Sequence, residues 1–368
     1  MMSFYQAMQL GAAQLKPLIK EESDKKIKRK YIGALIIKNI LCMLFCILIV
    51  SSFSSVFGSE NSIVGVVTVM LILTFRFANL DFKVKQSAVT LIGIFLIYAV
   101  APYLSNISNP ILGFIINFIS IITIIVLTCH NMMYANHVIL ILSYFLLYGN
   151  SVSSVEAYLS RVIGLLFGGI IVASIFYIKH KKTKKEYDNT ILDVIKGFDI
   201  KTERSRWQLK LALGVNTAVL IGEFMNFPKT MWIAFACMSV IQQTTKEKLN
   251  VRCKSRIIFA IVGCITFFVI YIVLPEHLRT MLPLMAGLMV GFCATYEWQT
   301  VVNSFSALPS AVATLGLIDT ITSRIISNVF GSLYSKLFDN LYDKVIYYMD
   351  NRFNNEEEDE FEQIEVNI

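Results

Sequence analysis

The sequence predicts an all-α integral membrane protein with about twelve transmembrane helices, arranged as two parallel six-helix repeats. Three observations predict this fold class. Hydrophobic residues make up 55% of the 368 positions and charged residues only 16%, which is too apolar for an ordinary soluble protein of this length. Basic residues gather in alternate loops. A nine-residue segment of the first half, residues 160–168, is repeated in similar form in the second half at residues 323–331.

The repeated phrase reads Ser-Arg-Val-Ile-Gly-Leu-Leu-Phe-Gly and then Ser-Arg-Ile-Ile-Ser-Asn-Val-Phe-Gly. Its flanks repeat too, because Glu156 lies five residues before Arg161 and Asp319 lies five residues before Arg324. Repeats about 165 residues apart, each with several apolar segments, are typical of transporters whose substrate path runs between the halves. The duplication therefore indicates transport rather than chemistry.

Apolar runs locate the expected spans. Those of the first half are residues 32–57, 63–77, 87–104, 111–128, 135–147 and 157–178. Those of the second half are residues 207–224, 231–241, 257–274, 282–296, 301–318 and 321–337. An even number of spans in each half means that both halves enter the membrane from the same side, so the repeats are parallel.

Short cytoplasmic loops collect lysine and arginine, and this rule orients the chain. The basic stretches are residues 16–30, 83–85, 179–206 and 246–256, and the loops between them are nearly uncharged. We therefore expect a multi-pass protein of the cell inner membrane with both termini in the cytoplasm. The net charge of +7 then reflects topology and attraction to anionic lipid in the bilayer, and it does not indicate nucleic acid as a partner.

These observations divide the chain into six parts. They are a cytoplasmic interfacial helix and basic segment at 1–30, the first repeat at 31–178, a basic cytoplasmic linker at 179–206, the second repeat at 207–337, an amphipathic helix extension at 338–350 and an acidic disordered tail at 351–368. The extension places an apolar pair every four residues. We expect this stripe to pack either on the protein's own cytoplasmic face or on a second copy in a homodimer.

The segment Met231–Gln243, with the basic stretch after it and a further span with Gly263, resembles the fusaric acid resistance and aromatic acid exporter family. The family has a Trp-led span followed by an Arg-x-x-Gly-x-x-x-Gly pattern. Arg161, Gly164 and Gly168 look like the same type of motif, whereas Phe259 stands where the family glycine would follow Arg256. The resemblance implies efflux of organic anions, aromatic carboxylates among them, driven by the proton gradient.

No motif for catalysis accompanies this pattern. The sequence has no Gly-x-x-x-x-Gly-Lys loop for a nucleotide, no nucleophile with its base and no cluster of metal ligands. Cys42 and Cys46 share a helix face within an apolar span, where they are best read as small packing residues. We therefore predict a protein that is not an enzyme and has neither cofactor nor metal.

Arg161 and Arg324 are expected at the outer ends of equivalent spans, six and twelve. A guanidinium in hydrocarbon is costly, so it faces protein, water or a partner. One hypothesis makes the two arginines carboxylate-binding residues, because the planar guanidinium pairs with an organic acid through two hydrogen bonds. The alternatives are ion pairs with Glu156 and Asp319, or side chains that reach back to the interface.

Three further cations are candidate substrate-binding residues. Lys38 and Lys210 lie one or two turns inside spans one and seven, and Arg256 flanks the cytoplasmic mouth of span nine. Each of them binds the anion or simply anchors its helix at the interface. The acidic groups nearest to apolar span ends are Glu223 and Glu297, which either carry the coupled proton or stay ionised at the interface.

Glycine pairs spaced by four residues let helix backbones approach closely in lipid. Gly164 with Gly168, and Gly287 with Gly291, are therefore predicted to be helix-packing positions. The resulting interpretation is proton-coupled efflux of organic carboxylate anions. A passive anion channel and a scaffold that recruits a cytoplasmic partner through the C-terminal helix remain as alternatives.

Overall fold

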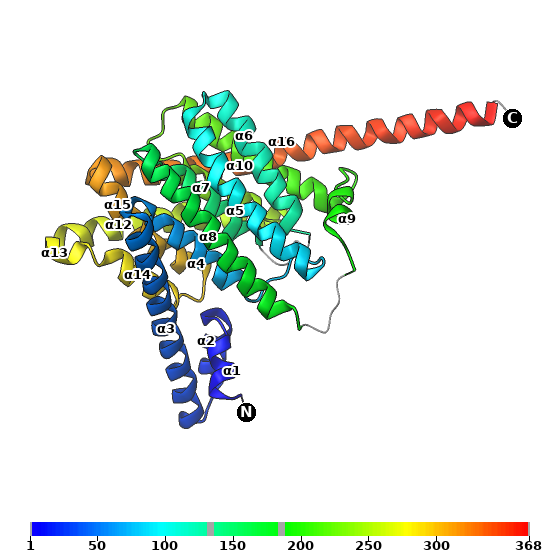
Figure 1. The fold of residues 1–368 in the computed structure, drawn as a ribbon. Helices are drawn as coiled ribbons and strands as arrows, with labels where there is room; N and C mark the ends of the chain where they lie inside the picture. Colours follow the sequence, from blue (N-terminus) through cyan, green and yellow to red (C-terminus); the bar gives the residue numbers. More distant parts are fainter. Residues whose placement is uncertain (1, 131–135, 183–187, 367–368) are drawn as a thin grey trace.

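The computed structural model describes residues 2–130, 136–182 and 188–366, and all regular secondary structure in this part of the chain is helical (Figure 1). The first half contains α1 (Phe4–Gln9), α2 (Ala12–Glu21), α3 (Lys25–Phe57), the 3-10 turn η1 (Ser59–Asn61), α4 (Ser62–Phe75), α5 (Val84–Ile107), α6 (Pro110–Thr128), α7 (Asn136–Gly149) and α8 (Val155–His180). The second contains α9 (Ile191–Lys196), α10 (Glu203–Phe224), α11 (Met231–Ile241), α12 (Lys246–Val273), α13 (Glu276–Arg279), α14 (Leu282–Val290), α15 (Tyr296–Leu315) and α16 (Leu317–Val366).

Local sequence explains where these helices begin and end. The side chains of Asn109 and Ser154 accept hydrogen bonds from the first turns of α6 and α8, at 2.9 and 3.1 Å. Pro110 occupies the first position of α6, where a missing N–H costs nothing. Gly58 ends α3 with a φ of 92°, and Gly316 separates α15 from α16 with a φ of 83°, conformations that favour glycine.

Each of the predicted apolar runs overlaps a helix, but not every helix is long and apolar enough to cross a membrane. Five helices of the described chain meet both conditions, namely α3, α5, α6, α8 and α12. Shorter apolar helices occupy 59–75, 136–149 and 231–241. In the remaining positions α14 has only 9 residues, while α10, α15 and α16 carry polar or charged side chains within their length. Length and composition therefore support five spans.

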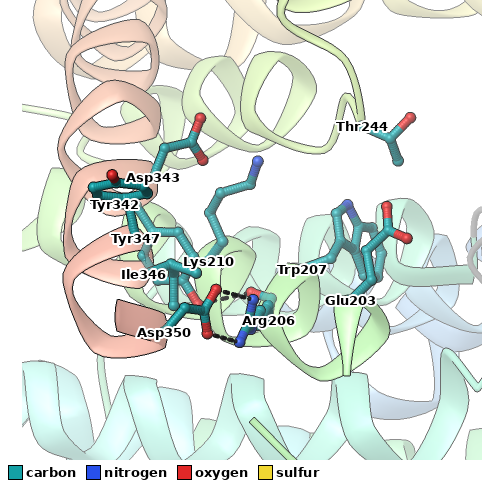
Figure 2. A pocket seen from close by; sticks show the side chains of 10 residues that line it. All are labelled: Glu203, Arg206, Trp207, Lys210, Thr244, Tyr342, Asp343, Ile346, Tyr347 and Asp350. Atoms are coloured by element: carbon teal, nitrogen blue, oxygen red, sulfur yellow. Dashed lines mark hydrogen bonds and ion pairs between the residues drawn. The ribbon is translucent and has the colours of Figure 1, made fainter. Parts of the chain in front are cut away.

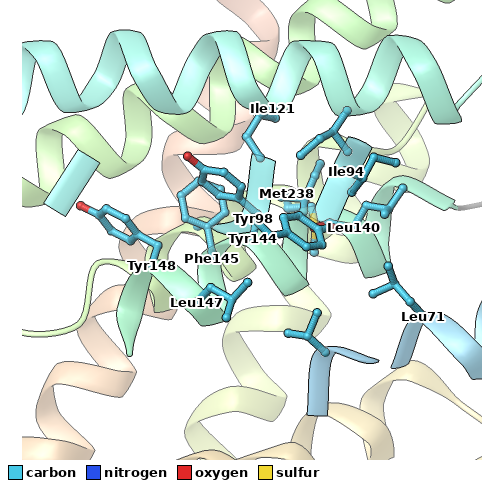
Figure 3. Packing of buried hydrophobic residues seen from close by; sticks show 14 of the residues in the cluster. Leu71, Ile94, Tyr98, Ile121, Leu140, Tyr144, Phe145, Leu147, Tyr148 and Met238 are labelled. Carbon is cyan, nitrogen blue, oxygen red and sulfur yellow. The ribbon is translucent and has the colours of Figure 1, made fainter. Parts of the chain in front are cut away.

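The buried side chains of both halves form one continuous apolar core. Helix α6 packs against α10 and α7 packs against α11, and these contacts join the first half to the second. Tyr98, Tyr144 and Phe145 lie in this core beside Met238 of the second half (Figure 3). Tyr144 donates a hydrogen bond to Asn117 Oδ1 at 2.7 Å, so its hydroxyl is satisfied inside the core.

A second, smaller cluster holds the N-terminal segment. Helices α1 and α2 pack along the beginning of α3 (Figure 1), where Ala7, Leu15 and Ala34 are fully buried. The interfacial helix predicted for residues 1–30 is thus two short helices and the start of α3, with Gly11 between the first two.

Helix α16 continues without interruption through the boundaries predicted at residues 337 and 350, and its far end extends away from the bundle (Figure 1). Its aromatic residues pack on α10, where Tyr334 donates to Thr217 Oγ1 at 2.7 Å and Tyr342 donates to the Arg206 carbonyl at 2.9 Å. The aromatic members of the stripe thus contact the protein itself, whereas Leu337, Leu341 and Val345 are more than half exposed.

The acidic segment expected to be disordered is helical as far as Val366, which differs from the prediction. It contains neither glycine nor proline and is rich in glutamate, a good helix former. Residues 183–187 of the predicted linker and residues 367–368 of the predicted tail lie outside the described residues.

Candidate functional site

A pocket of about 160 Å³ lies where the end of α5 meets the beginning of α8. By the topology predicted from the basic loops, this is the outer end of the first half. The pocket is lined by Tyr98, Ala99, Pro102, Tyr103, Asn106 and Ile107 of α5, by Leu147, Ser151 and Val152 around the end of α7, and by Tyr158 and Arg161 of α8. We call it the outer pocket.

Aromatic rings make up much of the wall of the outer pocket. The rings of Tyr103 and Tyr158 are stacked, with centroids 3.8 Å apart and an angle of 20° between their planes. The Tyr158 hydroxyl donates to the Ala99 carbonyl at 3.1 Å, and the Tyr98 hydroxyl donates to the Leu140 carbonyl at 2.8 Å. Because these hydroxyls are taken by the backbone, the rings act mainly as flat apolar surfaces.

Arg161 forms the charged part of this wall and is only 6% exposed. Its Nε donates to Asn61 Oδ1 at 2.9 Å, and its two terminal nitrogens donate to the carbonyls of Asn150 and of Glu60. A guanidinium has five N–H groups, so two are left without a partner among the described residues. The alternative ion pair with Glu156 is not formed, because neutral oxygens hold the arginine instead.

Sequence reasoning selected Arg161 but missed the tyrosines beside it. Tyr158 lies three residues before Arg161 on α8, a spacing that places the two side chains on one helix face. That signal was present in the sequence. Tyr103 comes from α5, and only the packing of α5 against α8 reveals that it is a neighbour.

In the second half, Asn328 accepts from the Arg256 side chain and donates to the backbone of Arg324. Arg256 Nε donates to Asn328 Oδ1 at 2.9 Å, and Asn328 Nδ2 donates to the Arg324 carbonyl at 2.7 Å. Arg256 also donates to the Tyr296 hydroxyl at 3.2 Å, and the Arg252 guanidinium lies 3.3 Å from the centre of the Tyr296 ring. Within the described residues, neither Arg256 nor Arg324 forms an ion pair.

Arg324 is the least satisfied of the predicted site residues. It is 7% exposed, and among the described residues it has no hydrogen-bond partner, not even the predicted Asp319. Its guanidinium carbon lies 5.0 Å from the centre of the Trp232 ring. A cation–π contact contributes about 2 kcal/mol when desolvated. Removing a charge from water costs several kcal/mol even after relaxation, so the ring does not compensate for the burial of Arg324.

The two lysines predicted to bind substrate each interact with another group of the protein instead. Lys38 Nζ donates to the Leu10 carbonyl of the N-terminal segment at 2.7 Å. Lys210 Nζ pairs with Asp339 Oδ1 at 2.7 Å, and the two side chains are only 12% and 5% exposed. The structure therefore places these lysines in different surroundings, and each has a partner other than a substrate.

Lys210 also lines a second pocket, of about 350 Å³, between the beginning of α10 and the far part of α16 (Figure 2). Opposite charges face each other there, with Arg206 paired to Asp350 through two hydrogen bonds. The other lining residues are Glu203, Trp207, Thr244, Tyr342, Asp343, Ile346 and Tyr347. Because its cations are already paired, this inner pocket offers an anion little free charge.

The two predicted proton carriers differ in their surroundings. Glu223 is half-buried at the end of α10, where the Tyr148 hydroxyl of α7 donates to its Oε1. Glu297 lies in the first turn of α15 and accepts a hydrogen bond of 3.4 Å from Ser255. Glu223 is thus tied to the other half of the chain, whereas Glu297 contacts only its own half.

The predicted packing glycines fall into two groups. A Cβ at Gly168 would lie 2.4 Å from Thr68 Oγ1, one at Gly164 would lie 3.3 Å from the Phe57 ring, and one at Gly291 would lie 2.5 Å from Asn39 Oδ1. A Cβ at Gly287 would meet nothing within 4 Å. The first three therefore sit at close helix contacts, and Gly287 faces open space.

Comparison with known proteins adds one relationship. No curated protein and no solved structure matches the chain. A family model described as fusaric acid resistance protein-like matches residues 217–338, which run from within α10 to within α16 and include Trp232, Arg256 and Arg324. The match confirms the resemblance predicted from the Trp-led segment, while Arg161 lies outside it. Residues 217–338, about a third of the chain, thus match a fusaric acid resistance protein-like domain.

Proposed function

We propose that this chain is a membrane transporter that exports organic carboxylate anions, coupled to the inward movement of protons. The observation that carries the proposal is the outer pocket, in which a nearly buried arginine with two free N–H groups borders a stacked pair of tyrosines. A guanidinium fixed by neutral oxygens keeps its charge for a ligand. The family of the second half is consistent with transport.

The shape of the outer pocket favours a small planar acid. The tyrosine rings offer a flat surface for an aromatic ring, and Arg161 offers N–H groups for its carboxylate. We therefore propose aromatic carboxylates among the substrates. A pocket of about 160 Å³ has room for a one-ring acid.

We propose that the protein lies in the cell inner membrane, with twelve spans in two parallel repeats and both termini in the cytoplasm. Several, though not all, equivalent helices of the two halves pack in the same pairs, which supports this arrangement. Helix α4 contacts α3 and α8, as α11 contacts α10 and α16, and α5 contacts α8 as α12 contacts α16. The homodimer is also a proposal, which rests on the sequence alone.

Coupling to protons is assigned to Glu223, because its contact with Tyr148 joins the two halves. A carboxylate that gains and loses a proton at this junction changes the contact between halves, which is what alternating access requires. Glu297 is the second candidate. A passive channel would need neither group, and a scaffold would use the far part of α16 in place of a transport path.

Efflux from proteoliposomes tests the proposal. Vesicles loaded with radiolabelled benzoate or acetate, with and without an imposed proton gradient, would compare the wild type with Arg161→Gln and Tyr158→Leu. Loss of a hydrogen bond to a charged group corresponds to roughly tenfold or greater loss of flux for Arg161→Gln. Tyr158→Leu should reduce benzoate flux more than acetate flux, because only benzoate has a ring to stack.

Tyr177→Leu is the matched control, because Tyr177 lies on the same helix, α8, away from the outer pocket. It should transport both acids like the wild type. Flux that Arg161→Gln leaves unchanged would overturn the assignment of the site. Flux that does not respond to the proton gradient at fixed voltage would identify a channel, and absence of flux for every acid would favour the scaffold.

A further inference from the structure

The contact between α11 and α16 buries four hydrogen-bonding groups that have no partner among the described residues. They are Trp232 Nε1, Arg324 Nη1, Thr320 Oγ1 and Ser327 Oγ. Trp232, Thr320 and Ser327 are 0% exposed, and Arg324 is 7% exposed. Buried polar groups in proteins are nearly always paired, so four unpaired groups at one helix contact need an explanation.

The three groups on α16 share the helix face that carries the contacts with α11. Thr320, Arg324 and Ser327 are spaced by four and three residues, which places them on one face of the helix. The same face continues to Gly331 and Ser335, the first packed against the Ile233 carbonyl and the second donating to the Cys237 carbonyl at 3.1 Å.

Trp232 stands at the opposite side of this contact, in the first turn of α11. The Arg324 guanidinium carbon lies 5.0 Å from the centre of its ring. An indole N–H and a guanidinium N–H are donors only, and a hydroxyl donates whenever an acceptor is offered. Arg324 and Trp232 are therefore donors from two helices in contact, and the described residues supply no acceptor to Nη1 of the first or Nε1 of the second.

The charge at this place is positive and uncompensated. Arg256 Nε donates to Asn328 Oδ1, Asn328 Nδ2 donates to the backbone carbonyl of Arg324, and neither guanidinium pairs with a carboxylate of the described chain. The cation–π contact with Trp232 is weaker than the cost of burying the charge. A group that accepts hydrogen bonds and carries negative charge satisfies both requirements at once.

We propose that Arg324, Trp232, Thr320 and Ser327 form a binding site for a compact anion, of the size of one carboxylate group. Burial of all four groups leaves little room, which excludes a large or multiply charged ligand. The anion is either the carboxylate of a substrate or a free inorganic anion such as chloride. This site goes beyond the proposed function, because it lies in the other half of the chain and binds at equilibrium whether or not the anion is carried across.

Calorimetric titration of the full-length protein in detergent tests the site. The protein would be held in the salt of a bulky sulfonate and titrated with acetate, benzoate or chloride, and its unfolding temperature would be followed with each anion. The wild type should bind at least one anion and unfold at higher temperature as that anion is added. Binding of chloride with no acetate or benzoate would identify an inorganic anion, and the reverse would identify a carboxylate.

Variants separate the anion site from a structural role. Arg324→Gln should bind at least about tenfold more weakly, and Trp232→Phe, which keeps a ring but removes the N–H, roughly threefold to tenfold more weakly. Trp298→Phe is the matched control, because Trp298 is 61% exposed on α15 and should bind like the wild type. Without anion, Arg324→Gln should be at least as stable as the wild type, because an uncompensated charge is gone.

Three results would overturn the proposal. They are no binding of any of the anions to the wild type, unchanged binding by Arg324→Gln and Trp232→Phe, or equal destabilisation of Arg324→Gln with and without anion. Should Arg324→Gln not fold, Trp232→Phe and Ser327→Ala give the same test. Binding and efflux are measured separately. Absence of transport would therefore not contradict anion binding at Arg324, and absence of binding there would not contradict transport.

Discussion

The substitution Gly331→Ala tests how closely α11 and α16 must approach. A Cβ at Gly331 would lie 2.8 Å from Ala236 Cβ and 2.8 Å from the Ile233 carbonyl oxygen. Non-bonded carbon atoms prefer about 3.5–4.0 Å, so the two helices would have to separate by roughly 0.7 Å or more. The neighbours are a backbone atom and a Cβ on a helix, which have no rotamer through which to move aside. Overpacking of this kind costs about 1–3 kcal/mol.

Replacing glycine by alanine in a helix also brings a gain of about 1 kcal/mol in intrinsic helix propensity. Gly287→Ala is the matched control, because a Cβ at Gly287 would meet nothing within 4 Å. Both variants receive the propensity gain, so it cancels from the comparison. Gly331→Ala should therefore be less stable than Gly287→Ala by about 1–3 kcal/mol.

Thermal unfolding of the purified protein in detergent, followed by tryptophan fluorescence, measures this difference. Gly331→Ala should unfold at a lower temperature than the wild type, and Gly287→Ala at the same or a higher temperature. Equal unfolding temperatures for the two variants would show that the contact between α11 and α16 is looser than the structure requires. The reasoning about close approach would then fail.

Two further predictions concern charged groups. Lys210→Met should destabilise the protein by about 3–5 kcal/mol because it leaves the buried Asp339 unpaired, and adding Asp339→Leu should recover part of the loss, as measured by the same unfolding assay. Hydrogen bonds from Ser153 lower the pKa of Glu60, so their stabilising effect is present above the ordinary carboxyl pKa and is lost as the pH falls through the folded-state pKa. The advantage of the wild type over Ser153→Ala should thus vanish in acid, and an advantage that is constant with pH would contradict this account.

The sequence predicted the positions of the helices better than which helices pack together. Every predicted apolar run overlaps a helix, because hydrophobic patterning is a local signal, but the start of α12 and the end of α16 lie more than ten residues outside the predicted runs. The number of spans was harder to predict, since helices such as α14 are shorter than a bilayer is thick. The helical end of α16 was missed because low hydrophobicity suggested disorder, while its helix propensity was left out of account.

The candidate site was only partly predictable, because the neighbours of its arginines come from distant parts of the chain. Arg161 and Arg324 stood out because charges are rare in apolar runs. Their surroundings depend on residues far away in the chain, such as Asn61, which lies 100 positions before Arg161, and Trp232, which comes from another helix. The repeat suggested that the two arginines are equivalent. Packing makes them different, since one is held by three protein oxygens and the other by none.

The length and continuity of α16 bear on how movements could pass along the molecule. Its 50 residues extend about 75 Å without a proline, and its one glycine, Gly331, is clamped against α11. Because a helix without an interior proline lacks the commonest cause of a kink, we expect a tilt at Arg324 to be carried along α16 to Asp350, which pairs with Arg206 at the inner pocket. In the proposed topology, a movement at the outer end of α16 would thus reach the inner pocket along a single helix.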